Sequence, residues 1–215
     1  KTFNPQMGIV GGISILGTSG IVEPMSMQAM IDTMALELRQ AAAQGHKRLI
    51  LTPVNYVQYF LTRHGLDGLG VPVVKCANFI GDALDQAAAE GFESVLLVGH
   101  VGKLVKLAGG IMNTHSRYAD CRTELFCAYA AVCGGGQALC ETLLDSATTD
   151  ACIALLDQAG LRAPVMARLL TAIDGHVRRR AAGAYPVGVL LFSNVYGVLG
   201  RTDGYEEVLH EWKKG

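Results

Sequence analysis

The fold is decided by three apolar runs, RLILT at residues 48–52, VPVVK at 71–75 and SVLLV at 94–98. Each run is followed by a turn and by a helix-type pattern that ends at a glycine. Strands of nearly continuous Ile, Leu and Val that alternate with helices are typical of a parallel sheet covered on both faces. The pattern predicts a Rossmann-like α/β fold with a mostly parallel sheet and βα units in the first half of the chain.

The residues around these runs predict the remaining elements. The apolar period from Met27 predicts a helix that Ser26 caps and that stops at Gly45. Asn55 and Asn78 are expected to cap the helices after the first two runs. Further helices are predicted at 123–138, 139–145, 149–159, 165–180 and near 209–212, and strands at 12–16 and 187–192. We therefore expect one α/β domain over residues 1–215, with a helical insertion at about 117–183.

Composition excludes some function classes. The 215 residues carry 18 Lys and Arg against 19 Asp and Glu, so no bulk positive field attracts nucleic acid or an anionic membrane. The most apolar stretch, residues 187–200, is interrupted by Ser193 and Asn194 and is too short to span a bilayer, which requires about 20 apolar residues. It is interpreted as a buried strand. Neither nucleic-acid nor membrane binding is expected, and a homo-oligomer stays open.

The six cysteines contain no C-x-x-C pair and are too sparse for a disulfide scaffold. They are interpreted as small apolar core residues in a reducing, cytoplasmic protein, and no metal site is expected. The chain begins with Lys1 and has no recognisable leader, so it is expected to be a piece of a longer protein.

Polar groups follow the predicted strands, and parallel strands bring such groups to one edge of a sheet. We expect a cofactor to bind there, at Gly17, Thr18, Ser19, Gly20, Thr52, Asn55, Asn78 and Gly99. The loop at 17–20 is not a G-x-G-x-x-G fingerprint and lacks the lysine of a Walker loop, and no acidic residue follows the strand at 48–52 to bind a ribose. An ordinary NAD or GTP site is therefore not expected.

Two histidines are candidate catalytic residues. His100 follows a buried strand, and His115 lies in a polar loop, so either could act as a general base, while His100 could instead be a donor that orients a ligand. The other histidines lie near helix ends, where solvent or the helix dipole suffices. Candidate substrate-binding residues are the cations Lys103, Lys106, Arg117 and Arg122, expected to form a cationic rim, with Ser193 and Asn194. Arg178, Arg179 and Arg180 are interpreted as cations at a helix C-terminus.

Three segments carry a resemblance to a known family. They are FNP at 3–5 with GGISILGTSGIVEPMS at 11–26, KCANFIG at 75–81 and GHVGKLVKLAGGIMNTHS at 99–116, with a weaker echo at FSN, 192–194. In these segments the chain resembles the CbiD family, densely over its first half and only in general character over its helical part.

The resemblance implies S-adenosylmethionine-dependent C1-methylation of cobalt-precorrin-5B, a tetrapyrrole, in anaerobic cobalamin synthesis. It also implies a further domain ahead of the segment seen here, without which the chain could be inactive. From the residues alone two alternatives stay open, a non-catalytic module that binds a nucleotide or a corrinoid, and an atypical NAD(P)-dependent oxidoreductase.

Overall fold

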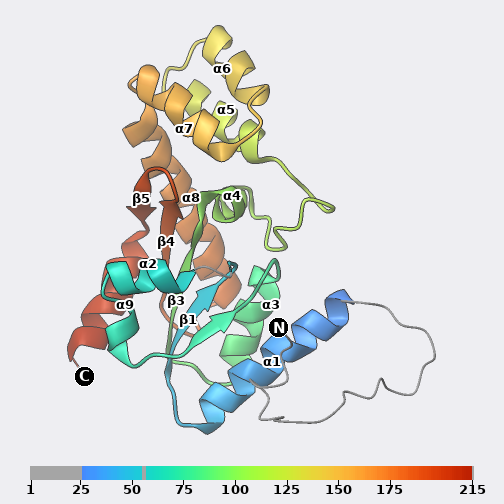
Figure 1. Ribbon diagram of the computed structural model, residues 1–215, viewed down its shortest axis with the longest axis vertical. Helices are drawn as coiled ribbons and strands as arrows, with labels where there is room; N and C mark the ends of the chain where they lie inside the picture. The colour runs from blue at the N-terminus through green and yellow to red at the C-terminus, as the bar shows by residue number, and fades with distance from the viewer. Residues whose placement is uncertain (1–25, 55–56, 215) are drawn as a thin grey trace.

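The computed structural model describes residues 26–54 and 57–214, and this part of the chain forms a five-stranded sheet (Figure 1). The sheet has the order β2-β1-β3-β4-β5. Its strands are β1 (Arg48–Thr52), β2 (Val73–Lys75), β3 (Ser94–His100), β4 (Val187–Ser193) and β5 (Gly197–Arg201). The first four are parallel, and β5 runs antiparallel to β4. The predicted α/β fold with a mostly parallel sheet is confirmed.

Helices connect these strands and cover both faces of the sheet. They are α1 (Met27–Ala43), α2 (Val57–Arg63), α3 (Ile80–Ala89), α4 (Val101–Leu104), α5 (Arg122–Val132), α6 (Gln137–Leu144), α7 (Thr149–Gln158), α8 (Arg162–Ala181) and α9 (Asp203–Lys214), with short 3-10 helices η2 (Asp67–Leu69) and η3 (Val105–Gly109). The predicted cap of α1 is confirmed, because the Ser26 hydroxyl accepts a hydrogen bond from the Ala29 N–H at 3.1 Å.

Alternate residues of each strand point to opposite faces, and each face has its own apolar core. In β1, Leu49 and Leu51 pack with α1, α3 and α8, whereas Ile50 packs with α2 and α9. All three side chains are fully buried. The apolar runs are nearly continuous because both faces are covered.

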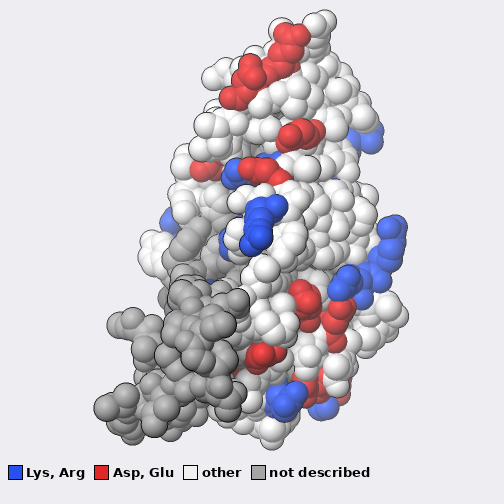
Figure 2. All heavy atoms as spheres, turned by 90° about the vertical axis from the view of Figure 1, so that its right-hand side faces the viewer, with Lys and Arg blue, Asp and Glu red and all other residues white. Residues whose placement is uncertain are grey.

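The helical region predicted at 117–183 corresponds to α5 to α8. Helices α5, α6 and α7 form a group at the top of Figure 1, and α8 leads from this group down along the sheet. The predicted cation-rich C-terminus of α8 is confirmed: Arg178 pairs with Asp174 and Glu207, and Arg180 pairs with Asp85. Figure 2 shows basic and acidic side chains mixed on the face that it presents, with acidic ones at the upper end.

Several predicted boundaries are wrong. Strand β2 begins at Val73 rather than Val71, and β3 extends two residues beyond Val98, so Gly99 and His100 lie within the strand. The helix predicted at 123–138 ends at Val132, because Gly134 adopts a φ of +94°. The stretch at 187–200 forms two strands with a turn between them rather than one.

The return from β5 places α9 very close to β4. A Cβ at Gly188 would lie 2.5 Å from the Cα of Tyr205, so only glycine allows this approach. The predicted strand at 12–16 lies outside the described residues. None of the helices in the described ranges is both long and apolar enough to cross a membrane.

Candidate functional site

Four parallel strands end at one edge of the sheet, so the residues after β1, β2, β3 and β4 gather there (Figure 1). Strand β1 lies between β2 and β3, and the chain reverses direction across the sheet at β1 and β3. Such a reversal is where open α/β sheets bind ligands. The predicted cofactor residues Gly17, Thr18, Ser19, Gly20 and Asn55 lie outside the described residues.

Lys103 joins the loops that follow β1 and β2. Its Nζ donates hydrogen bonds to the carbonyl oxygens of Pro53 at 2.9 Å and Ala77 at 3.4 Å. Burial lowers the pKa of Lys103. Ala77 has a φ of 50°, a left-handed conformation that is costly for alanine. The structure therefore uses Lys103 to hold a strained loop at the sheet edge.

Lys106 has a similar role further from the sheet. Its side chain is only 3% exposed, and Nζ donates to the carbonyl oxygens of Thr114 at 3.1 Å and Ala119 at 2.8 Å. Asp120 lies 3.7 Å from the ammonium group. Lys106 thus lies inside the protein, not on an exposed cationic rim, because these oxygens replace the water that an ammonium group requires.

Three predicted cofactor residues hold the loops together. The Thr52 hydroxyl accepts from the Val54 N–H at 3.3 Å. Gly99 is covered by Pro53, whose Cγ would lie 2.8 Å from an added Cβ. Asn78 does not cap α3, whose N-cap position is Phe79, so that expectation is wrong.

The side chain of Asn78 instead accepts a hydrogen bond from the Thr114 hydroxyl at 3.3 Å, and its carbonyl accepts from the Thr114 N–H at 2.9 Å. Phe79 and Asn113 form an antiparallel bridge next to these bonds. The loop containing His115 is thereby brought beside the loop after β2.

Both candidate histidines accept a hydrogen bond at Nδ1. His100 accepts from the Gly102 N–H at 3.0 Å, and His115 accepts from the Arg117 N–H, also at 3.0 Å. A nitrogen that accepts carries no proton, so each neutral ring carries its proton on Nε2. In this arrangement Nε2 of either neutral ring is a hydrogen-bond donor and not a base. Burial lowers the pKa of half-buried His100, and the Asp150 carboxylate opposes this shift.

The predicted substrate residues differ in what their side chains contact. Arg122 pairs with Asp120 through two hydrogen bonds. Arg117 and Asn194 are exposed. The Ser193 hydroxyl is buried, donates to Asp150 of α7 at 2.7 Å, and accepts from the N–H groups of Val195 and Tyr196. Ser193 therefore fastens the β4–β5 turn to the helical insertion.

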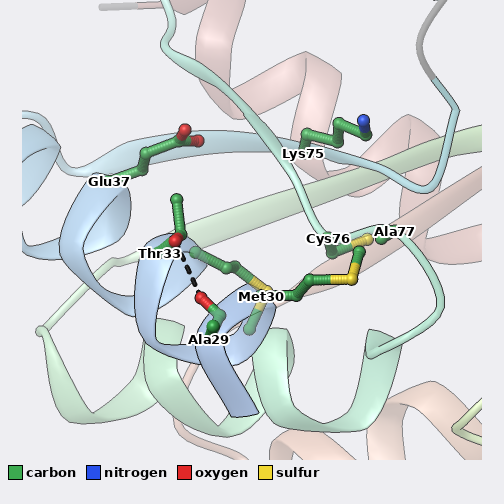
Figure 3. A pocket seen from close by; sticks show the side chains of 8 residues that line it. Ala29, Met30, Thr33, Glu37, Lys75, Cys76 and Ala77 are labelled. Carbon is green, nitrogen blue, oxygen red and sulfur yellow. Dashed lines mark hydrogen bonds between the residues drawn. The ribbon is translucent and has the colours of Figure 1, made fainter. Parts of the chain in front are cut away.

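One cavity lies at the end of β2. This β2 cavity has a volume of about 240 Å³ and is lined by Ala29, Met30, Thr33, Met34, Glu37, Lys75, Cys76 and Ala77. Figure 3 shows that α1 supplies Met30, Thr33 and Glu37, and that the end of β2 supplies Lys75 and Cys76. Burial raises the pKa of Glu37, and Lys75 opposes this. Burial also raises the pKa of Cys76 to about 12, so its thiol stays protonated.

A second cavity lies at the end of β4. This α2 cavity has a volume of about 490 Å³ and is lined by Tyr59, Phe60, Arg63, His64, Phe192, Ser193, Asn194, Val195, Tyr196 and Gly197. The rings of Phe60 and Phe192 stack with centroids 4.1 Å apart, and His64 lies 4.2 Å from Phe60. Two of the residues predicted from sequence, Ser193 and Asn194, therefore share a cavity with aromatic and basic side chains.

Sequence reasoning missed Glu37, Asp150 and Arg63, and it set His64 aside because it lies near a helix end. Glu37 and Arg63 lie on helices with no motif around them, and Asp150 reaches Ser193 across 43 positions of the chain. The only sequence signal was the length of α2, which brings Arg63 and His64 to its C-terminal end.

The thiols agree with the sequence interpretation in part. All six cysteines are free; Cys76 and Cys152 are buried, and the other four are partly exposed. Within the described ranges, no group of three or more His, Cys, Asp or Glu side chains could hold a metal ion.

Together, the sheet order and the cavities at its carboxyl edge define an open-sheet α/β protein with two cavities where its parallel strands end, the edge at which proteins of this class bind ligands. Sequence profiles for CbiD match residues 1–24, and those for the C-terminal domain of CbiD match residues 113–203. The chain belongs to the CbiD family.

Among curated proteins, the chain is similar to several named cobalt-precorrin-5B C(1)-methyltransferase. That of Ruminiclostridium cellulolyticum is 42% identical over all of this chain and 58% of its own length. That of Alkaliphilus metalliredigens is 42% identical over 93% of this chain and 52% of its own length. That of Thermoanaerobacter is 47% identical over 75% of this chain and 43% of its own length.

The chain thus spans about half the length of the curated relatives it matches. No solved structure matches it significantly.

Proposed function

We propose that this chain takes part in the S-adenosylmethionine-dependent C1-methylation of cobalt-precorrin-5B, a step of cobalamin biosynthesis. The observation that carries the proposal is the 42% identity, over the whole chain, to the Ruminiclostridium cellulolyticum protein of that name. The geometry supports it, because two cavities open at the edge where this fold class binds ligands.

The residues of the β2 cavity fit the methyl donor. Met30, Met34 and Cys76 give the cavity an apolar, sulfur-rich wall, and Glu37 adds a single carboxylate that can accept hydrogen bonds from ribose hydroxyls. When bound, S-adenosylmethionine supplies a sulfonium methyl group, which a nucleophilic ring carbon takes up while sulfur keeps the electrons of the broken bond. The predicted loop at Asn78 adjoins this cavity through Ala77.

The remaining groups at the edge would position the reactants. Lys103 fixes the loops after β1 and β2, and the Nε2–H of His100 offers one directed donor. Methyl transfer to carbon depends mainly on holding donor and acceptor at attack distance, so rigid loops suit it better than a strong base would.

Calorimetric titration with S-adenosylhomocysteine tests the donor site. The protein should bind it, and Glu37→Gln should weaken binding about tenfold, because a charge-assisted hydrogen bond to ribose becomes a neutral one. Glu93→Gln, an exposed glutamate outside the cavity, is the matched control. Binding of NADH in preference to S-adenosylhomocysteine would contradict the proposal and favour an oxidoreductase.

Methyl transfer from labelled S-adenosylmethionine to cobalt-precorrin-5B tests the reaction itself. His100→Asn keeps an acceptor for the Gly102 N–H but removes the Nε2 donor, so it should lower turnover about tenfold if that donor orients the substrate. Binding of both ligands with no transfer would instead favour a non-catalytic module.

A further inference from the structure

The α2 cavity combines a cation, aromatic surface and access to solvent. Arg63 lies at the end of α2 and has no hydrogen bond or ion pair to any residue that the structure describes. Most other arginines in this part of the chain have carboxylate partners, such as Arg122, Arg178 and Arg180. With no such partner in the described part of the chain, the guanidinium group of Arg63 keeps its hydrogen-bonding capacity for an anion that comes from outside the chain.

None of the described groups that line the cavity neutralises the charge of Arg63. Burial lowers the pKa of His64, and the positive charges of Arg63 and Arg201 lower it further. His64 is thus mainly neutral at physiological pH, so Arg63 is the principal cation of the cavity. Among the described residues that line the cavity, none is acidic.

Aromatic side chains provide an apolar surface beside this cation. Tyr59 is 75% exposed, which is unusual for a large aromatic side chain, and Val195 on the opposite β4–β5 turn is 70% exposed. Phe60 and Phe192 stack behind them. A conjugated ring can lie against such a surface, and a carboxylate on its edge can form a forked ion pair with a guanidinium group.

From this arrangement we propose that the α2 cavity binds one carboxylate-bearing edge of the tetrapyrrole, with Arg63 as the partner of that carboxylate and Tyr59 against the ring. The inference rests on the proposed function and goes beyond it by assigning the two ligands to different cavities. A macrocycle with several acidic arms is too large for a cavity of about 490 Å³, so only part of it is held there. The donor, by contrast, is assigned to the β2 cavity.

The competing occupant is S-adenosylmethionine, which also has an aromatic ring and a carboxylate. Two titrations therefore need to be made on each variant, visible absorption with cobalt-precorrin-5B and calorimetry with S-adenosylhomocysteine. Arg63→Gln should raise the Kd for cobalt-precorrin-5B about tenfold and leave that for S-adenosylhomocysteine unchanged. Arg63→Lys should recover part of the loss, since it keeps the charge without the fork.

Arg179→Gln is the matched control, because Arg179 is also exposed and also has no ion pair to a described residue, but lies on α8 away from the cavity. In turnover, Arg63→Gln should raise KM and leave kcat nearly unchanged, as expected for a group that binds ground state and transition state equally. Tyr59→Ser, which removes an exposed ring, should weaken tetrapyrrole binding severalfold.

Three results would overturn the inference. If Arg63→Gln binds cobalt-precorrin-5B as well as Arg179→Gln does, in a protein that still transfers methyl groups, the assignment is wrong while the proposed function stands. If Arg63→Gln weakens S-adenosylhomocysteine instead, the two cavities are exchanged. If the unaltered protein binds S-adenosylhomocysteine but no tetrapyrrole, both the inference and the proposed acceptor fail.

Discussion

Two regions at the carboxyl edge of the sheet differ in what their basic side chains contact. Beside β1, β2 and β3, the ammonium groups of Lys103 and Lys106 bind backbone carbonyls of their own chain. Beside α2 and β4, Arg63 is exposed and has no such partner among the described residues. All three are basic residues close to candidate ligand sites, but the sequence indicated only the two lysines as candidate binding residues.

The difference shows that a cation at a ligand edge has one of two functions. A buried ammonium group must be compensated by oxygen atoms of the protein, and it then stabilises the loops that supply them. An exposed guanidinium group that is not compensated keeps its hydrogen-bonding capacity for a ligand. Stability measurements can separate the buried cations from the exposed one. The predictions below are given from the largest expected effect to the smallest.

The largest effect is expected for Lys106→Met. This change keeps the length of the side chain but leaves one buried and one partly buried carbonyl without their charged donor, so it should lower the free energy of unfolding by about 3 kcal/mol. Urea denaturation measures it, with Lys213→Met, at an exposed position of α9, as the control. A loss no larger than that of the control would mean that Lys106 does not hold the loop at 114–120.

Lys103→Met should have the same kind of effect but a smaller one, about 1.5 kcal/mol, because Lys103 is only partly buried and one of its bonds is 3.4 Å long. The strained loop at Ala77 should also become mobile. Amide hydrogen exchange at residues 76–79 measures this directly, and unchanged protection there would contradict the role of Lys103.

A third effect depends on pH. The pKa of His100 is lowered in the folded protein, so below its unfolded value of about 6.5 the unfolded chain takes up a proton more readily than the folded one does. Stability contributed by the neutral ring is therefore complete above about pH 6.5 and is lost as the pH falls toward the folded pKa. His100→Asn should reduce the difference in unfolding free energy between pH 7.5 and 5.5, measured by urea denaturation at the two pH values, and an unchanged difference would contradict this role of the neutral ring.

The smallest effect on stability is expected for Arg63→Gln, within about 0.5 kcal/mol of the unaltered protein, because the exposed side chain that is removed has no hydrogen bond or ion pair to a described residue. Thermal unfolding without ligand measures it. A marked loss of stability would show that Arg63 is committed to the fold in the same way as Lys106, and the contrast between the two sides of the edge would not hold.

Much of the fold followed from local pattern. The strands at β1, β3 and β4 are apolar runs buried on both faces, and such runs are recognisable without knowledge of the neighbours. Strand β5 was not predicted, because Gly197 to Arg201 is short, partly exposed and lies on the sheet edge. Strand β5 is stabilised by its pairing with β4, and the local sequence pattern does not reveal this pairing.

The sequence predicted where the candidate site lies, but not what each of its side chains contacts. Parallel topology brings the loops together, but the use of each side chain depends on distant partners. Asn78 looks like a helix cap and bonds instead to Thr114, 36 positions away. The sequence does not indicate that the Asp150 carboxylate contacts Ser193, because the two residues are far apart in the chain and meet only in the folded protein.

The hydroxyl group of Ser193 links two parts of the molecule. Its oxygen atom is hydrogen-bonded to Asp150 at the start of α7 and to two N–H groups of the β4–β5 turn. That turn forms one wall of the α2 cavity. Any movement of the wall when a ligand enters must stretch the bond to Asp150, and any displacement of the helical insertion must disturb the wall. The helical insertion and this wall of the α2 cavity are thus linked through the hydrogen bonds of one serine.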